Sequence, residues 1–259
     1  MKRVAILGCG AIGSIIAQYI DRENFVELVG IYDINAEAMS SLKSKLKKQK
    51  PTLTESLDEI LDLDPDIVIE ATCPKSTAEN AEKVLENCDL IILCTGILTK
   101  LRNKLLGVCE RTGHRLFAPS GAIGGIDVIL AIAQEGIEKI SITTTKKPKS
   151  LKGYENIKKR TVVFSGPASK AIKKFPTNIN VAVTLSFAAG KEAKVRIIAD
   201  PKVKYNQHEV YAKSKHTEFQ ARIANIPSKD NPRTSQLAAL SALQILKQAI
   251  SKGGVKIGN

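Results

Sequence analysis

The first half of the chain alternates short apolar runs with segments whose apolar residues recur every three or four positions. Apolar runs predict strands at 3–7, 27–32, 67–70, 89–94 and 115–117, and the longer periodic segments predict helices at 13–20, 36–47, 57–62, 77–87 and 100–112. Strands that are apolar throughout and alternate with helices are typical of a parallel sheet covered on both faces. The pattern therefore predicts an α/β N-terminal domain.

The pattern changes after residue 136. Apolar and polar residues then alternate with a period of two at 141–145, 162–164, 181–188, 194–199, 207–214 and 217–224. Several short strands of this kind, with few helices between them, indicate a mostly antiparallel sheet. We predict a second domain of the α+β class.

The last segment has a helical stripe of apolar residues at 237, 240, 243, 246 and 250. Thr234 or Ser235 could cap its start, and Gly253 could end it. A single amphipathic helix must bury its apolar face, and packing back on the N-terminal domain achieves this. We therefore predict one domain of residues 1–120 with the helix 231–252, and a second domain of residues 121–230.

A glycine-rich turn follows the first predicted strand, in VAILGCGAIGSIIA at 4–17. Its spacing is Gly8-x-Gly10-x-x-Gly13, with Ala11 and Ile12 between the last two glycines. In such a turn the first glycine permits a tight bend, the second lets a pyrophosphate approach the backbone, and the third lets helix and strand pack closely. The helix N-terminus then meets the phosphate charge. The motif predicts a dinucleotide-binding Rossmann domain.

The second predicted strand leads into Asp33, twenty residues after Gly13. A carboxylate at this spacing accepts hydrogen bonds from the adenosine ribose hydroxyls. It also repels a 2'-phosphate, which favours NAD over NADP. The next residues, Ile34 and Asn35, include no arginine, and use of both cofactors stays open.

The composition is that of an ordinary globular protein, with 43% hydrophobic and 25% charged residues. The net charge is +13, and basic residues are concentrated between 146 and 174. Aromatic residues make up only 4%, and no nucleic-acid-reading motif is present. We therefore expect solvated surface charge or attraction of an anionic substrate, with no nucleic-acid partner.

No apolar run reaches the length of a membrane span, and MKRVAILG enters a strand at once, which predicts neither membrane partner nor signal peptide. The five cysteines contain no C-x-x-C pair and are typical of reduced cysteines in a cytoplasmic protein. The three histidines are scattered, and we predict no metal site.

The stretch NQHEV at 206–210 places a histidine on a predicted strand. His208 shares a strand face with Val210 and Ala212, because alternate residues point the same way. A structural histidine at a sheet edge is one interpretation. A proton-transferring group is the other, because an imidazole of ordinary pKa, ~6.5, exchanges protons near neutrality. We assign structural or surface roles to the other two histidines, His114 and His216.

Longer blocks carry a resemblance to a known family. They are GCGAIG at 8–13, SGAIGG at 120–125, TTTKKP at 143–148, FPTNINVAVT at 175–184, ADPKVKYNQHEV at 199–210 and NIPSKDNPRTS at 225–235. With these blocks the chain resembles the L-aspartate dehydrogenase family over nearly its whole length. The resemblance implies NAD(P)-dependent oxidative deamination of L-aspartate to iminoaspartate, or oxaloacetate, and ammonia, or the reverse. It also implies a homodimer, with residues 121–230 as the domain for catalysis, substrate binding and dimerisation, and a step that feeds NAD biosynthesis.

The resemblance also implies roles for single residues. His208 corresponds to the family's acid/base, and Ala122 and one asparagine of the NIN segment correspond to cofactor contacts. Asn180 is that asparagine if the chain is two residues shorter near AAGKEAK, and otherwise Asn178 is. From the residues themselves, Lys146 or Lys147 could pair with a substrate carboxylate, since both follow a predicted strand; plain surface charge is the alternative.

Two other functions stay open at this stage. One is a related reductase, like dihydrodipicolinate reductase, acting on another small dicarboxylate imine; the paired-histidine motif of that family is absent. The other is a non-catalytic protein that senses NAD, for which the basic segment is the only feature.

Overall fold

The computed structural model of the chain describes residues 1–175, 179–226, 235–251 and 253. The chain divides into two compact units. The first comprises Met1–Pro119 together with the C-terminal segment that begins at Ala239, and the second comprises Ser120–Ala238. Each unit has its own sheet and its own apolar core.

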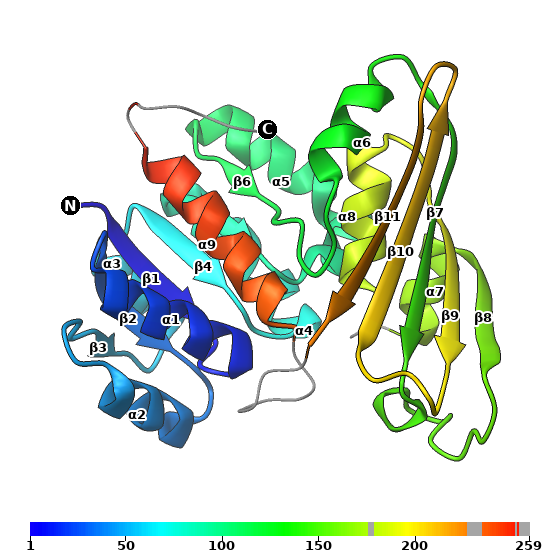
Figure 1. Cartoon of the computed structure of the whole chain (residues 1–259). Coiled ribbons are helices and arrows are strands. Elements are labelled where there is room, and N and C mark those ends of the chain that lie inside the picture. Colours follow the sequence, from blue (N-terminus) through cyan, green and yellow to red (C-terminus); the bar gives the residue numbers. More distant parts are fainter. Residues whose placement is uncertain (176–178, 227–234, 252, 254–259) are drawn as a thin grey trace. The chain divides into compact units, whose positions relative to one another are not determined.

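The first unit contains a six-stranded sheet in the order β3-β2-β1-β4-β5-β6, in which all pairings are parallel (Figure 1). Its strands are β1 (Arg3–Leu7), β2 (Glu27–Tyr32), β3 (Thr52–Leu53), β4 (Ile67–Glu70), β5 (Asp89–Ile92) and β6 (Leu116–Phe117). The predicted parallel α/β architecture is confirmed. The short edge strand β3 was not predicted, because two residues carry no periodic signal.

Helices cover both faces of this sheet, because successive strand residues point to opposite sides. Val4 and Ile6 pack with helices α1 (Ala11–Glu23), α2 (Ala36–Lys45) and α9 (Gln236–Ile250). The intervening Ala5 and Leu7 pack with α3 (Leu57–Asp62), α4 (Pro74–Asn87) and α5 (Leu98–Thr112). Burying an isoleucine such as Ile6 contributes about 2 kcal/mol. A short 3-10 helix, η1 (Thr95–Ile97), joins β5 to α5.

The last helix, α9, packs in the core of the first unit as predicted, through Ala239, Ala242, Leu243 and Leu246. The predicted stripe was wrong in one position: Leu240 is 38% exposed. Alanines supply half of the contact face, and alanine gives a weaker hydrophobic signal in a sequence than leucine or isoleucine does. The suggested cap Thr234 and residues 231–233 lie outside the described residues.

The second unit contains a five-stranded sheet in the order β11-β10-β7-β9-β8 (Figure 1). Its strands are β7 (Ile137–Lys146), β8 (Thr161–Pro167), β9 (Lys194–Ala199), β10 (Asn206–Ser214) and β11 (Glu218–Asn225). Only the pairing of β7 with β9 is parallel, so the predicted mostly antiparallel sheet is confirmed. A 3-10 helix, η2 (Pro148–Ser150), follows β7.

Three helices pack in the core of this second unit: α6 (Ile126–Ala133), α7 (Ala168–Lys174) and α8 (Asn180–Ala188). The strand predicted at 181–188 is therefore wrong, since those residues form α8. The segment VAVTLSFA combines β-branched residues with a period of two, which favours a strand. Four consecutive residues, 182–185, are buried in α8, so several sides of the helix face the core and no helical stripe is visible in the sequence.

Candidate active site

The glycine turn between β1 and α1 has the geometry that its sequence predicts. Gly8 has φ of +97°, and a Cβ there would lie 2.4 Å from the carbonyl oxygen of Ala71. A Cβ on Gly13 would lie 1.8 Å from the carbonyl oxygen of Gly8. Both positions thus exclude every side chain. A Cβ on Gly10, in contrast, would meet nothing within 4 Å, so its backbone is open to a ligand.

Helix α1 begins directly after this open position. Gly10 is its N-cap residue, no side chain caps the helix, and its first turn, which contains Ala11 and Ile12, holds no acidic residue. The first N–H groups of a helix lack partners within the helix and carry a partial positive charge. The turn can therefore hold a phosphate group.

Asp33 follows β2 and is tied to the glycine turn. Its Oδ2 accepts a hydrogen bond of 2.7 Å from the backbone N–H of Cys9, and its Oδ1 accepts one of 2.9 Å from that of Asn35. The carboxylate is half-buried, so each oxygen keeps room for a further donor such as a ribose hydroxyl. Asp33 both shapes the turn and faces the position where a ribose is expected.

Glu70, at the end of β4, was not singled out from the sequence. It is 2% exposed and accepts hydrogen bonds from Thr72, Thr77 and the backbone of residues 93 and 94. The run IVIEATCP did hold a signal, because an acidic residue at the end of an otherwise apolar parallel strand is unusual, and such a residue needs partners if it is buried.

His208 lies within β10 in the second unit. It is 4% exposed and shares its buried face with Val210 and Ala212, as predicted. The interpretation as a sheet-edge histidine is wrong, because β10 lies between β11 and β7. Nδ1 is 2.9 Å from Oγ1 of Thr144, the directly opposite residue on β7. This contact fixes the ring, and Nε2 has no hydrogen-bond partner among the residues that the structure describes.

Lys146 ends β7 on the same face as Thr144, two residues along the strand, and its side chain is half-buried. Burial lowers the pKa of Lys146 to about 8. Burial, and then the charge of Lys146, lower the pKa of His208 to about 3. The surroundings thus disfavour the charged form of both groups, and a bound anionic ligand would stabilise those charged forms. The neighbouring Lys147 is exposed.

The segment SGAIGG lies in the same unit. The carbonyl oxygen of Ala122 accepts a 3.0 Å hydrogen bond from the amide of Asn225, which is buried at the end of β11. A Cβ on Gly121 would lie 3.4 Å from Val181, so this turn packs against the first residues of α8, next to Asn180. Asn178 lies outside the described residues. Ala122 and Asn180 are therefore brought to one region of the second unit.

The other two histidines have ordinary contacts. His114 Nδ1 is 2.8 Å from the carbonyl oxygen of Leu85, and the exposed His216 is 2.8 Å from Glu135. Within the described ranges, no group of three or more His, Cys, Asp or Glu side chains could hold a metal ion. No helix in the described part of the chain is long and apolar enough to cross a membrane. All five cysteines are free.

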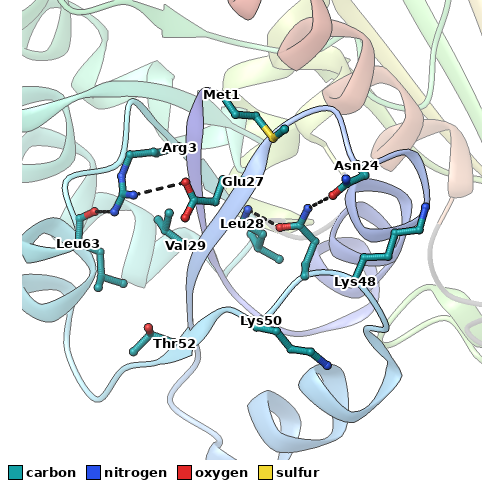
Figure 2. A pocket seen from close by; sticks show the side chains of 11 residues that line it. Met1, Arg3, Asn24, Glu27, Leu28, Val29, Lys48, Lys50, Thr52 and Leu63 are labelled. Atoms are coloured by element: carbon teal, nitrogen blue, oxygen red, sulfur yellow. Dashed lines mark hydrogen bonds and ion pairs between the residues drawn. The ribbon is translucent and has the colours of Figure 1, made fainter.

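A pocket of about 400 Å³ opens at the amino ends of β1 and β2 (Figure 2), away from the glycine turn at their carboxyl ends. Several of the polar groups that line it already have protein partners. Arg3 binds Glu27 and the carbonyl of Leu63, and Gln49 binds the N–H of Leu28 and the side chain of Asn24. We therefore do not place the active site in this pocket.

Comparison with known proteins matches each unit to a family. Residues 8–119 match the NAD binding domain of homoserine dehydrogenase, and residues 127–249 match the C-terminal domain of aspartate dehydrogenase. The whole chain is 38% identical over 271 residues to the L-aspartate dehydrogenase of Methanocaldococcus jannaschii, with 100% of both chains covered. It is 39% identical over 267 residues to that of Nitrosopumilus maritimus, with 97% of each covered. The chain belongs to the L-aspartate dehydrogenase family.

Solved structures agree with this membership. The crystal structure of aspartate dehydrogenase from Thermotoga maritima superposes with a TM-score of 0.80 at 30% identity, covering 99% of this chain and 100% of that one. A hyperthermophilic archaeal homoserine dehydrogenase in complex with NADPH has a TM-score of 0.63 at 12% identity, and supports the fold alone. The first unit of this L-aspartate dehydrogenase family member is its NAD(P)-binding domain.

Proposed function

We propose that the protein is an NAD(P)-dependent L-aspartate dehydrogenase, which deaminates L-aspartate oxidatively to iminoaspartate and then oxaloacetate and ammonia. The full-length similarity to L-aspartate dehydrogenases carries this proposal. The open backbone of Gly10 beside Asp33, and the pair of His208 and Lys146, supply the groups that the reaction requires.

The first unit supplies the cofactor site. When bound, the nicotinamide accepts a hydride from Cα of the substrate. The residues proposed to hold the dinucleotide are Gly8, Gly10, Ala11, Ile12, Gly13 and Asp33, with Ala122 and Asn180 from the second unit. The Asp33 carboxylate favours NAD, since it would receive ribose hydroxyls and repel a 2'-phosphate.

His208 is the proposed acid/base. Thr144 occupies Nδ1, so Nε2 is the nitrogen that can take a proton from the substrate nitrogen or from the water that attacks the imine. The lowered pKa keeps the free imidazole neutral at pH 7, ready to act as a base. Returning that proton assists the departure of ammonia.

Lys146 is the proposed partner of a substrate carboxylate. Its ammonium is a point charge in half-buried surroundings, where an ion pair is less screened by water than on the surface. Burial is the larger cause of the lowered pKa of His208, and the charge of Lys146 is the second cause. A bound carboxylate would offset that charge and raise the pKa of His208. Substrate binding would thereby adjust the base for proton transfer. The exposed Lys147 is the weaker candidate for this contact, although the sequence did not separate the two.

Absorbance at 340 nm tests the proposed function. The purified chain is mixed with NAD or NADP and, in turn, L-aspartate, L-glutamate, other amino acids and small dicarboxylates. We expect reduced cofactor to form with L-aspartate and far less with the others. Turnover only with another dicarboxylate, or none with any amino acid in either direction, would reject the assignment.

The assembly is proposed from the family resemblance. We propose a cytoplasmic homodimer, with a mass in solution of twice the 28.0 kDa of the chain. Light scattering coupled to size exclusion measures this mass directly, and a monomer at micromolar concentration would reject the dimer.

A further inference from the structure

The carboxylate of Glu70 makes five hydrogen bonds at the carboxyl edge of the parallel sheet. Its Oε1 accepts from the backbone N–H of Thr72 at 2.7 Å and from the hydroxyls of Thr72 and Thr77 at 2.7 and 2.8 Å. Its Oε2 accepts from the N–H groups of Leu93 and Cys94 at 3.2 and 3.1 Å. None of these five donors is a charged side chain. Burying a carboxylate without a cationic partner costs free energy, and hydrogen bonds to its oxygens must offset that cost.

These bonds join two separate loops. Thr72 belongs to the turn between β4 and α4, and residues 93 and 94 belong to the segment between β5 and η1. The first of these loops also contacts the glycine turn: Ala71 donates a 2.8 Å hydrogen bond to the carbonyl of Leu7, and its own oxygen lies against Gly8. Glu70 therefore fixes the backbone next to the candidate phosphate turn.

The sheet order shows which half of a dinucleotide lies there. Ligands of such sheets bind at the carboxyl ends of the strands, where the strand order reverses; here that point is between β1 and β4. Asp33 follows β2, on one side of β1, and marks the adenosine half. The N-terminus of α1 receives the pyrophosphate. The nicotinamide half is therefore left on the other side, over the ends of β4 and β5, where Glu70 fixes both loops.

We propose that Glu70 is a positioning residue for the nicotinamide half of the cofactor. It does not contact the reacting atoms, because its oxygens are already occupied. It holds the loops after β4 and β5 in the shape that seats the nicotinamide ring. This inference rests on the proposed NAD(P)-dependent function.

The test compares two ligands that differ only in the nicotinamide. Dissociation constants for NAD⁺ and ADP-ribose are measured by calorimetry on the full chain. Glu70→Ala releases both loops, and we expect NAD⁺ to bind about tenfold more weakly, a loss of about 1.4 kcal/mol, with ADP-ribose changed by no more than about twofold. In the 340 nm assay the same variant should raise KM for NAD and lower kcat.

Glu70→Gln is the conservative variant. Its amide oxygen can still accept from residues 93 and 94, and its NH₂ can donate to the two threonine hydroxyl oxygens, but it cannot accept from the N–H of Thr72. We expect an intermediate loss of NAD⁺ affinity. If Glu70→Ala does not fold, this variant decides the question alone.

Asp21 offers a matched control in the same unit. It is also a buried carboxylate, and it accepts hydrogen bonds from the backbone N–H groups of residues 47, 48 and 49, away from the carboxyl edge. Asp21→Asn should lower the melting temperature and leave the ratio of the two dissociation constants unchanged.

Three results would contradict either the role of Glu70 or the proposed function, and they can be told apart. Equal losses for NAD⁺ and ADP-ribose in both Glu70 variants, or no loss, would overturn the role of Glu70 while the proposed function stands. If Asp21→Asn also changed the ratio of the NAD⁺ and ADP-ribose dissociation constants, the effect would come from a general loss of stability in the unit. That result would also overturn the proposed role of Glu70. If the wild-type chain bound neither ligand, the proposed function itself would fail, and this inference with it.

Discussion

His208 should make the stability of the protein depend on pH in a defined window. Its pKa is lowered from 6.5 to about 3, first by burial and then by the charge of Lys146. A folded-state pKa below the unfolded value means that the unfolded chain binds the extra proton between these two values. The contribution of His208 to the free energy of unfolding is therefore fully present above pH 6.5, and it is lost as the pH falls from 6.5 toward 3.

The size of this effect follows from the two pKa values. Between pH 7 and pH 5 the unfolded imidazole becomes protonated and the folded one stays neutral, which costs about 2 kcal/mol of unfolding free energy by linkage. His208→Asn removes the titrating group and retains an amide that can bond to Thr144. Its stability should fall by about 2 kcal/mol less than that of the wild type over the same interval.

Urea unfolding at pH 7 and pH 5 measures both changes, and the contributions of all other groups cancel in the difference. His216→Asn is the matched control, since it removes an exposed imidazole from the same unit and should keep the wild-type loss. The chain has only three histidines, so NMR can follow each ring separately. Two results would refute the reasoning. One is an equal change in unfolding free energy between pH 7 and pH 5 for the wild type and His208→Asn. The other is a His208 NMR signal that titrates near pH 6.5 in the free protein.

Four further outcomes are expected. His208→Ala should lower kcat with L-aspartate by about 100- to 10,000-fold, the usual contribution of a general acid or base, with NAD binding kept; a rate within tenfold of wild type would leave only a structural role. Asp33→Ala should weaken NAD more than NADP, as measured by KM for each; because Asp33 also holds the N–H of Cys9, both should weaken somewhat, and equal losses would contradict the ribose contact. Gly13→Ala places a methyl group 1.8 Å from a backbone oxygen, so it should lower both the melting temperature and NAD affinity, and an unchanged protein would show that the turn can relax. Dialysis against a chelator should leave activity intact; a loss restored only by a divalent cation would reveal a metal requirement.

Much of the first unit could be predicted because its signals are local. The strands at 3–7, 27–32 and 67–70 were predicted with the bounds that the structure shows. Parallel strands covered on both faces are apolar throughout, and the glycine turn needs its residues for steric reasons that act within one bend. Gly8 and Gly13 can hold no side chain because backbone atoms of the same few elements lie against them.

The second unit was harder to predict because its helices depend on packing. The segment 181–188 favours a strand by composition, yet it forms α8 because four consecutive residues are buried in the core. Helices α6 and α7 were also not predicted. Local propensity is worth only tenths of a kcal/mol per residue, and burial of several apolar side chains outweighs it.

The sequence by itself determined the Rossmann turn, the acid at Asp33 and, through its longer blocks, the family. It drew attention to His208 but left Lys146 and Lys147 equal and did not reveal Thr144 or Glu70. Only the tertiary structure placed Thr144 opposite His208, left Lys146 half-buried near that pair and exposed Lys147. The physical reason is that a motif such as the glycine turn depends on steric limits between residues that lie close together in the fold around a single turn. A pKa and a hydrogen-bond network instead depend on burial and on partners far away in the chain, such as Thr144 and His208, which are 64 positions apart.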